Sequence, residues 1–258
     1  MAVARASAIQ LKSAREIEIM ARGGAILAAT HAFVRPRVVP GVSTWDLDKQ
    51  AEEFIRSHVG ATPAFKGLYG FPGSLCLSIN QEIVHGIPSK KRILAEGDIL
   101  SVDAGVKYEG MYTDAAITVG VGEIPEESAR LLAVTEQSLE AGIAAAVLGN
   151  HVEDIGVAVQ QVVEAAGFSV VRDLVGHGVG YAPHEDPQVP NYGKPKRGPR
   201  LQAGMTIAIE PMVNVGGPTT REMPDKWTIV TADGTRSAHF EHTVAITEDG
   251  PRVLTRVV

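Results

Sequence analysis

The sequence predicts an α+β protein in which helices pack outside an antiparallel β-sheet. The main observation is the order of segments, because two helical patterns followed by strand-like patterns occur twice along the 258 residues. The residues themselves show no repeat, so the two halves are expected to be similar in architecture only. No change in composition marks a flexible linker. We therefore expect one compact domain over residues 1–258, with residues 1–12 as a short N-terminal arm.

The first block contains two expected helices. Ser13 and Glu16 have the spacing of a capping box, in which each side chain bonds a free backbone N–H of the first helical turn. Apolar residues then follow at helical spacing until Pro36 and the Pro40-Gly41 pair interrupt them. A second helix is expected over residues 44–60, with an apolar stripe formed by Leu47, Ala51, Phe54 and Ile55.

Strand-like patterns occupy residues 74–121. Leu75, Leu77 and Ile79 alternate with other residues, which is typical of a strand. The strand-like segments 99–103 and 115–119 lie on either side of Tyr108, Glu109 and Gly110, which indicates a β-hairpin.

The second block repeats this order. Helices are expected over residues 125–148 and 151–166, the first opening with a proline at a tolerated early position. Strands are expected over residues 205–210, 226–231 and 240–247, after a loop rich in proline and glycine at residues 183–199.

The composition excludes several classes of protein. The single cysteine, Cys76, rules out an internal disulfide framework and a cysteine-rich zinc module. The net charge of −6 without a long basic run argues against a nucleic-acid groove. The N-terminal residues lack the apolar core of a signal peptide, and no unbroken apolar run approaches membrane-helix length. These observations fit a reducing cytoplasm, with neither a membrane nor a nucleic acid as partner.

Two aspartates stand on the arms of the expected hairpin. A turn centred between Tyr108 and Glu109 would place Asp103 directly opposite Asp114. Facing like charges on paired strands are unfavourable, and more so where water is excluded, so a cation is expected between them. The alternative is that both aspartates face solvent on the wet side of the sheet, and the hairpin pattern alone does not decide between these readings.

Three further residues complete a candidate metal-binding set. His177 lies among three glycines, Glu210 ends the apolar run 207–209 before Pro211, and Glu241 opens the last expected strand. Each alone is more often structural. Together with the two aspartates they supply four carboxylates and one neutral imidazole, which balance two divalent cations. Such a set suits manganese, iron(II), cobalt, nickel or a two-zinc site, and a pair of such ions is suited to amide hydrolysis.

Taken together, these residues resemble the type I methionine aminopeptidases, which have the pita-bread fold: two pseudo-symmetric halves with helices outside a curved antiparallel sheet. The resemblance extends from about Ile17 to the C-terminus. The motifs that carry it occur in the same order and spacing: Ser78-Ile79-Asn80 before His85-Gly86-Ile87-Pro88, Gly97-Asp98 before Asp103, Thr113-Asp114, Gly176-His177-Gly178, His184-Glu185, Ile209-Glu210-Pro211-Met212 and Phe240-Glu241-His242-Thr243.

The resemblance implies roles for individual residues. Asp103, Asp114, His177, Glu210 and Glu241 would bind two divalent metal ions, with Asp114 and Glu241 serving both. Glu210 would also exchange protons with the attacking water and the leaving amine. His184 would hydrogen-bond the scissile carbonyl or its oxyanion, and His85 would contact the scissile nitrogen.

A methionine pocket is implied as well, with a wall that includes Phe71, Cys76, His85 and Trp227. The sequence departs from the family pattern at its rim, where Leu68 replaces a usual tyrosine and Pro183 a common large side chain. These departures leave pocket selectivity open. By the same resemblance, backbone oxygens of Asn80, Glu82 and Ser237 would hold a monovalent cation.

The implied activity is removal of the initiator methionine from nascent proteins with a small second residue, by a cytoplasmic monomer that works at the ribosome. Only 25 residues separate His184 from Glu210, which leaves no room for the helical insertion of type II enzymes. Two alternatives remain at this point. One is a proline-directed aminopeptidase or creatinase-like protein, which usually carries a large N-terminal domain. The other is a non-catalytic binding module of the same fold, which typically has lost metal ligands.

Overall fold

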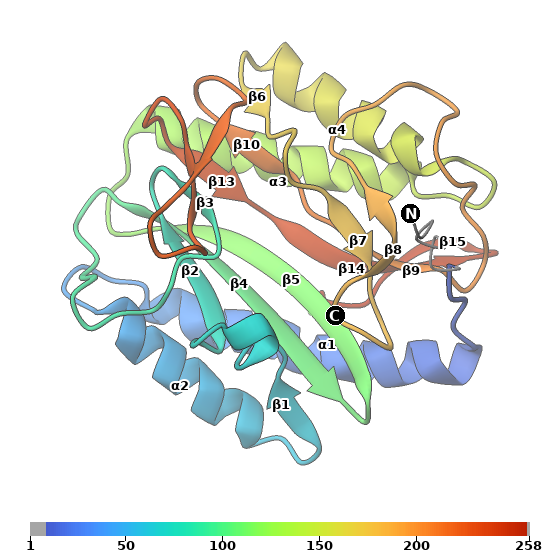
Figure 1. Ribbon diagram of the computed structural model, residues 1–258, viewed down its shortest axis with the longest axis horizontal. Coiled ribbons are helices and arrows are strands. Elements are labelled where there is room, and N and C mark those ends of the chain that lie inside the picture. Colours follow the sequence, from blue (N-terminus) through green and yellow to red (C-terminus); the bar gives the residue numbers. More distant parts are fainter. Residues whose placement is uncertain (1–8, 257–258) are drawn as a thin grey trace, which may run out of the picture.

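The computed structural model describes residues 9–256, so eight residues of the expected N-terminal arm lie outside the described residues. Figure 1 shows two pairs of helices on either side of a group of long strands. The helices are α1 (Ala14–Val34), α2 (Thr44–Arg56), α3 (Glu126–Ala145) and α4 (Val152–Ala165), with short 3₁₀ turns η1 (Arg35–Arg37) and η2 (Leu68–Gly70).

The strands of the first half are β1 (Ala61–Pro63), β2 (Leu75–Ile79), β3 (Glu82–Val84), β4 (Ile99–Tyr108) and β5 (Met111–Gly120). Those of the second half are β6 (Ser169–Val170), β7 (Gly176–Gly178), β8 (Glu185–Val189), β9 (Thr206–Ile209), β10 (Met212–Asn214), β11 (Thr220–Glu222), β12 (Ile229–Thr231), β13 (Ser237–His239), β14 (Glu241–Thr247) and β15 (Gly250–Val253).

Both predicted helix pairs are present, with ends that differ by a few residues. The capping box at Ser13 and Glu16 is formed, so the start of α1 is confirmed. The helix expected over residues 44–60 ends at Arg56, and the chain reverses at Gly60, whose φ is +86°. Pro125 and His151 are the N-caps of α3 and α4, one position before the helical residues.

The segment Ala14–Arg37 is long and apolar enough, by length and composition alone, to cross a membrane. Half of its most apolar window is buried inside the protein. Met20, Leu27 and Val34 on this helix are fully buried in hydrophobic clusters, which is the pattern of a core helix rather than of a lipid-facing one.

The long strands form one antiparallel sheet whose two sides belong to different halves of the chain. The order is β1-β4-β5-β14-β9-β7-β8, with β2 added beside β4 and β15 beside β14. The buried core of the first half packs α1 and α2 against β2, β4 and β5, while that of the second half packs α3 and α4 against β9 and β14. The seam between the halves is the antiparallel pair β5–β14, where Ala116 faces Glu241. The predicted α+β architecture, with two halves and helices packed outside an antiparallel sheet, is confirmed.

The predicted register of the β4–β5 hairpin is wrong. Asp103 pairs with Ala116, and Asp114 pairs with Gly105, so the aspartates are diagonal neighbours instead of direct partners. The reason is the turn, which consists of Glu109 and Gly110, both with positive φ, and is therefore centred one residue later than expected. Because a strand has a side-chain period of two, both aspartates still lie on the same face.

The predicted loop over residues 183–199 is wrong in part, because it contains strand β8. This strand pairs with β7 through Gly176 and His177, with an irregularity between His177 and Gly178. The prolines and glycines of the segment are typical of a loop, so the five-residue strand within it was not predicted. The pairing matters for the site, because it brings His184, which directly precedes β8, beside His177.

Candidate active site

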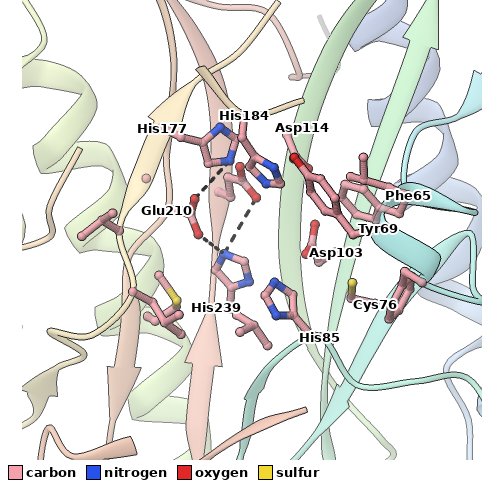
Figure 2. Close-up of a pocket in the computed structure, with 18 of the residues that line it drawn as sticks. Phe65, Tyr69, Cys76, His85, Asp103, Asp114, His177, His184, Glu210 and His239 are labelled. Atoms are coloured by element: carbon pink, nitrogen blue, oxygen red, sulfur yellow. Dashed lines mark ion pairs between the residues drawn. The ribbon is translucent and has the colours of Figure 1, made fainter. Parts of the chain in front are cut away.

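A pocket of about 600 Å³ opens over the β5–β14 seam, within the size range of small-ligand sites. All ten residues that the sequence nominated for metal binding, catalysis or substrate contact line this pocket. Figure 2 shows the polar residues converging from both halves of the sheet, with His85 and Cys76 on the side of the first half. The ten are Phe71, Cys76, His85, Asp103, Asp114, His177, His184, Glu210, Trp227 and Glu241.

The pocket floor carries four buried carboxylates. Asp103, Asp114 and Glu241 are exposed by 8%, 5% and 2% and come from the central strands β4, β5 and β14. Glu210 directly follows β9. Burial raises the pKa of all four carboxyl groups, to about 7 for Asp103, and repulsion between the acids raises those of Asp114, Glu210 and Glu241 further. Like-charged groups packed this closely away from water need a cationic partner.

The donor set fits divalent metal ions. Asp103 Oδ1, Asp114 Oδ1 and Glu241 Oε1 are buried and have no hydrogen-bond partner among the described residues. Ligand atoms of Asp114, His177 and Glu241 all lie within 4.8 Å of one another, and His177 Nε2 lies 3.4 Å from Glu210 Oε1. Buried oxygens that lack a partner and converge with one nitrogen are what a hard or borderline dication requires.

His177 is oriented to present a lone pair to this cluster. Its Nδ1 lies 2.9 Å from the carbonyl oxygen of Gly178, an arrangement in which Nδ1–H donates and Nε2 remains free to bind metal. Burial lowers its pKa to about 4, so the ring is neutral near pH 7, as a metal ligand must be.

His184 and His85 stand beside the metal-binding cluster. The rings of His177 and His184 are 4.5 Å apart in an edge-to-face arrangement, and Tyr69 stacks on the other side of His184 with ring centroids 6.3 Å apart. Burial lowers the pKa of both His184 and His85. Both rings are therefore neutral near pH 7, with one donor and one acceptor nitrogen each. The His85 ring uses its N–H on the backbone of Trp227, so its other nitrogen is left as an acceptor.

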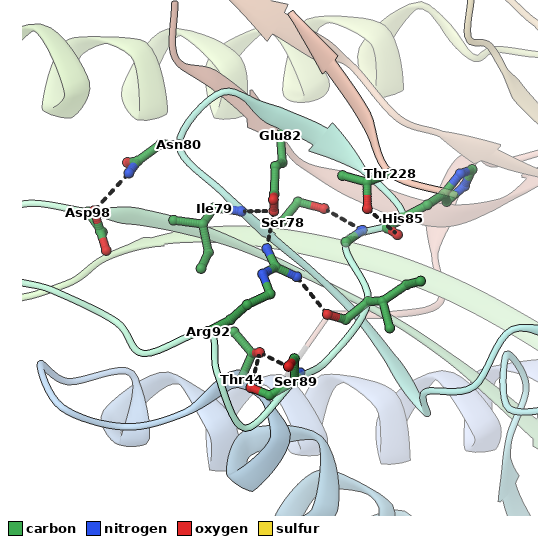
Figure 3. Close-up of polar contacts among 12 residues, drawn as sticks. Thr44, Ser78, Ile79, Asn80, Glu82, His85, Ser89, Arg92, Asp98 and Thr228 are labelled. Carbon is green, nitrogen blue, oxygen red and sulfur yellow. Dashed lines mark hydrogen bonds and ion pairs between the residues drawn. The ribbon is translucent and has the colours of Figure 1, made fainter. Parts of the chain in front are cut away.

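The backbone around His85 is held in a constrained shape. His85 has a φ of 60°, in the left-handed region that few residues other than glycine adopt. Gly86 donates its N–H to Ser78 Oγ at 3.1 Å, and a Cβ on Gly86 would lie 2.2 Å from the carbonyl oxygen of Leu77. Figure 3 shows Arg92 beneath this loop, donating to the Ile87 carbonyl and paired with Glu82. These contacts fix the direction in which the His85 ring points.

An apolar cluster forms the wall on the side of the first half. Phe71 and Trp227 meet edge to face with centroids 5.1 Å apart, and Cys76 packs beside them. The structure thus brings together Phe71, Cys76 and Trp227, and the fourth residue nominated for the methionine pocket, His85, lines the same cavity. Phe65 and Leu68 belong to the same cluster. Of the two departures from the family pattern, Leu68 lines the pocket and Pro183 does not.

The three residues nominated for a monovalent cation lie close together at the end of β2. The Asn80 carbonyl accepts the N–H of Ser237 at 2.9 Å, and Asn80 has a positive φ of 54°. The Glu82 carboxylate accepts the N–H of Ile79 at 2.7 Å and so points toward the same turn. Figure 3 places Asn80 beside Asp98, to which its side-chain amide donates.

Sequence reasoning missed two kinds of pocket residue. His239 is 2% exposed and lies within 4 Å of both Glu210 and Glu241, although its only sequence signal is its place two residues before Glu241. Phe65 and Tyr69 lie in the segment between β1 and β2, which has no motif. A histidine next to a nominated ligand could have been found, whereas loop aromatics carry no periodic pattern.

Comparison with known proteins identifies the family. Residues 18–248 match the model of metallopeptidase family M24. A methionine aminopeptidase from Clostridium perfringens is 53% identical over 249 residues, which cover 96% of this chain and 99% of that protein. The crystal structure of a Thermotoga maritima methionine aminopeptidase is 46% identical with a TM-score of 0.95, covering 97% of this chain and 100% of that one.

A Pyrococcus furiosus prolidase has a TM-score of 0.77 at 22% identity, covering 96% of this chain and 66% of that one, and so shares the fold alone. The identity to methionine aminopeptidases over nearly the whole chain, together with a pocket that holds all five nominated metal ligands, decides between the alternatives. The chain belongs to the methionine aminopeptidases of metallopeptidase family M24.

Proposed function

We propose that this pocket removes N-terminal methionine with Asp103, Asp114, His177, Glu210 and Glu241 as the ligands of two divalent metal ions. The observation that carries the assignment is the floor of the pocket, where four buried carboxylates and one correctly oriented imidazole converge. Four negative charges and a neutral ring balance two dications. When bound, such a pair of ions activates water and polarises a carbonyl.

The side chains of the chain supply the remaining chemistry. Glu210 takes a proton from the attacking water and returns it to the leaving amine, since its carboxylate faces the centre of the pocket. His184 donates a hydrogen bond to the carbonyl oxygen as negative charge develops on it. His85, held by its left-handed backbone, contacts the scissile nitrogen from the side of the first half.

We propose that the apolar cluster of Phe65, Leu68, Phe71, Cys76 and Trp227 holds the methionine side chain. An unbranched thioether fits an irregular wall of aromatic rings and one thiol, and sulfur–aromatic contacts add to its binding. The free α-amino group would lie near the carboxylates. The second residue of the substrate would then sit against the histidines, where Tyr69 narrows the space and favours a small side chain.

The ligand set accepts cobalt, manganese, iron(II), zinc or nickel, and cellular supply selects among them. We further propose a monovalent cation at the Asn80–Ser237 turn, supported by the close approach of Asn80, Glu82 and Ser237. The substrates would be nascent polypeptides that emerge from the ribosome, met by a monomer in the cytoplasm. The single buried cysteine fits that reducing location.

The proposal is tested with a panel of short peptides that vary at the first two positions. Chelator-treated protein should release methionine from Met-Ala-Ser only after Mn²⁺ or Co²⁺ is added back, and excess chelator should abolish the release. Replacement of alanine by a bulky second residue should reduce kcat/KM by at least about tenfold, equivalent to 1.4 kcal/mol. Free methionine is measured by liquid chromatography.

Two results would contradict the proposal. Preferential cleavage of Xaa-Pro peptides over Met-Ala-Ser would show that the pocket selects a different substrate. Full activity in the presence of excess chelator would show that the carboxylate cluster does not work through metal ions. A Phe71→Ala variant serves as the pocket control, because it should raise KM for Met-Ala-Ser without changing the metal requirement.

A further inference from the structure

His239 is a buried polar side chain to which the reaction described above gives no role. It ends strand β13, two residues before Glu241, and is 2% exposed. Neither of its ring nitrogens has a hydrogen-bond partner among the described residues. An unsatisfied buried polar group costs on the order of 1–3 kcal/mol, so its place in the floor of the pocket calls for an explanation.

The ring of His239 faces two of the nominated metal ligands at once. Its Nε2 lies 3.7 Å from Glu210 Oε2 and 3.8 Å from Glu241 Oε2. The other oxygen of Glu210, Oε1, faces His177 at 3.4 Å. Figure 2 shows His177 and His239 at opposite ends of the Glu210 carboxylate, so two imidazoles bracket this one acid.

The two imidazoles differ in their surroundings. His177 Nδ1 is engaged by the Gly178 carbonyl, so its Nε2 offers a lone pair to the metal-binding cluster. No backbone carbonyl engages His239 in that way, so the tautomer with hydrogen on Nε2 is free to form. That N–H points at two carboxylate oxygens, which are strong acceptors.

We propose that His239 is a positioning residue that donates its Nε2–H to Glu210 and Glu241 and so holds both carboxylates in the orientation that binds metal. The inference rests on the proposed function, because it assigns His239 to the same metal centre. Closing either gap to hydrogen-bond distance requires a shift of roughly half an ångström, which a small rotation of ring or carboxylate supplies. A neutral ring leaves the charge balance of four carboxylates against two dications unchanged.

Three substitutions test this role. His239→Gln keeps an N–H donor at a similar distance from the backbone, His239→Asn carries the same amide on a shorter side chain, and His239→Leu has similar bulk without a donor. Removal of a hydrogen bond to a ligating side chain typically weakens metal binding 10–100-fold. We expect that loss for Leu and Asn, and Mn²⁺ affinity within about threefold of the parent protein for Gln.

Metal affinity is measured by titration calorimetry on chelator-treated protein, which requires no turnover. The visible absorption of the Co²⁺-loaded proteins is recorded beside it and should keep its band positions in every variant, because no ligand is lost. The kcat for Met-Ala-Ser should fall in the Leu and Asn variants at saturating metal, with KM little changed. Circular dichroism checks that each variant is folded. If the Leu variant is unfolded, the difference in Mn²⁺ affinity between the Gln and Asn variants tests the proposal.

Equal metal affinity in the parent, Asn and Leu proteins would overturn the proposal and leave His239 as a packing residue. Weakened affinity in all three variants, with a shifted Co²⁺ spectrum, would overturn it in a different way, because His239 would then be a direct metal ligand. A parent protein that binds no divalent metal would overturn the proposed function itself. The same titration of the parent separates that result from a failure of the His239 role alone.

Discussion

Glu210 is proposed both to bind metal and to transfer a proton, and its two carboxylate oxygens lie in different surroundings. Oε1 faces His177, and Oε2 faces His239. Burial and the charge of Asp103 raise the pKa of this carboxyl group well above its usual range. Divalent ions held by the cluster would offset this rise and keep the carboxylate ionised, so that it can accept a proton.

A Glu210→Gln variant should remain folded and lose most of its activity. The amide preserves the volume of the side chain, so the thermal unfolding midpoint should stay close to that of the parent. It cannot accept and return a proton, so kcat for Met-Ala-Ser should fall by at least about 10²-fold. Turnover is measured at saturating Mn²⁺, with the exposed Glu109→Gln as the matched control. Near-normal turnover of the Glu210→Gln protein would contradict the proton-transfer role.

Among the residues of the site, those that lie in sequence motifs could be predicted, and those outside any motif could not. Asp103 and Asp114 could be argued as neighbours from the hairpin alone, although their exact pairing depended on which residues form the turn. His177 was plausible from its glycine setting, whereas Glu210 and Glu241 were nominated mainly through family motifs. Phe65 reaches the pocket only because the segment after β1 folds over Gly105, whose missing Cβ leaves room for the phenyl ring. Such a contact has no signature in local sequence.

Among the elements, an ion pair joins the N-terminal segment to the β7–β8 turn. It is the most buried lysine or arginine ion pair among the described residues. Lys12 and Glu185 form an ion pair with side-chain exposures of 1% and 8%. Glu185 also accepts the N–H of Ala182 at 2.8 Å, so it braces the turn that contains His184. The residues just before α1 therefore help to position His184, the distant histidine that is proposed to hydrogen-bond the scissile carbonyl.

A Lys12→Met variant should lower the free energy of unfolding by about 3 kcal/mol or more, because it leaves Glu185 buried without its cation. The double variant Lys12→Met/Glu185→Gln should recover part of that loss, since no buried charge then remains unpaired. Urea denaturation measures the free energy of unfolding of both variants. The Arg22–Glu109 pair, with side-chain exposures of 57% and 46%, supplies the control: Arg22→Met should cost less than about 1 kcal/mol. An equal loss of unfolding free energy in Lys12→Met and Arg22→Met would contradict a special role for the buried pair.

Long helices and strands were predicted from the sequence more accurately than short ones. All four helices were anticipated, because ten or more residues display an apolar period clearly. Strands β6, β7 and β13 have only two or three residues, too few to show alternation. Strand β4 is buried over most of its length, yet its sequence alternates, because only one face packs on the helices. Leu100, Val102, Ala104 and Val106 lie in the core of the first half, whereas Asp103 on the opposite face lines the pocket.

The whole molecule buries several histidines as neutral rings, which makes its stability depend on pH. His31, on α1, is buried between the carbonyl of Val102 and the charged or titratable groups of His242 and Arg35. Burial lowers its pKa to about 3 from 6.5. Between these two values the unfolded chain binds a proton that the folded chain does not. Stability is therefore lost as the pH falls below about 6.5.

Removal of this ring should flatten the acid side of the stability profile. For His31→Leu, the slope of the unfolding free energy against pH between 6 and 4 should decrease by about 1.4 kcal/mol per pH unit. Urea denaturation of metal-free protein at several pH values gives the slope. The carboxylates of the pocket titrate in both proteins, so their contribution cancels in the comparison. Parallel profiles for parent and variant would show that His31 is protonated equally in both states.

The seam between β5 and β14 also determines when during folding the hydrolytic centre can exist. It joins Ala116 to Glu241, so the whole intervening segment must be closed into a loop before these strands meet. Contacts between such distant segments form late, because a long loop has to be closed first. An ion that binds only the completed cluster therefore slows unfolding more than it speeds folding. A partly folded chain has no working peptidase, so hydrolysis begins only after the last long strand has docked.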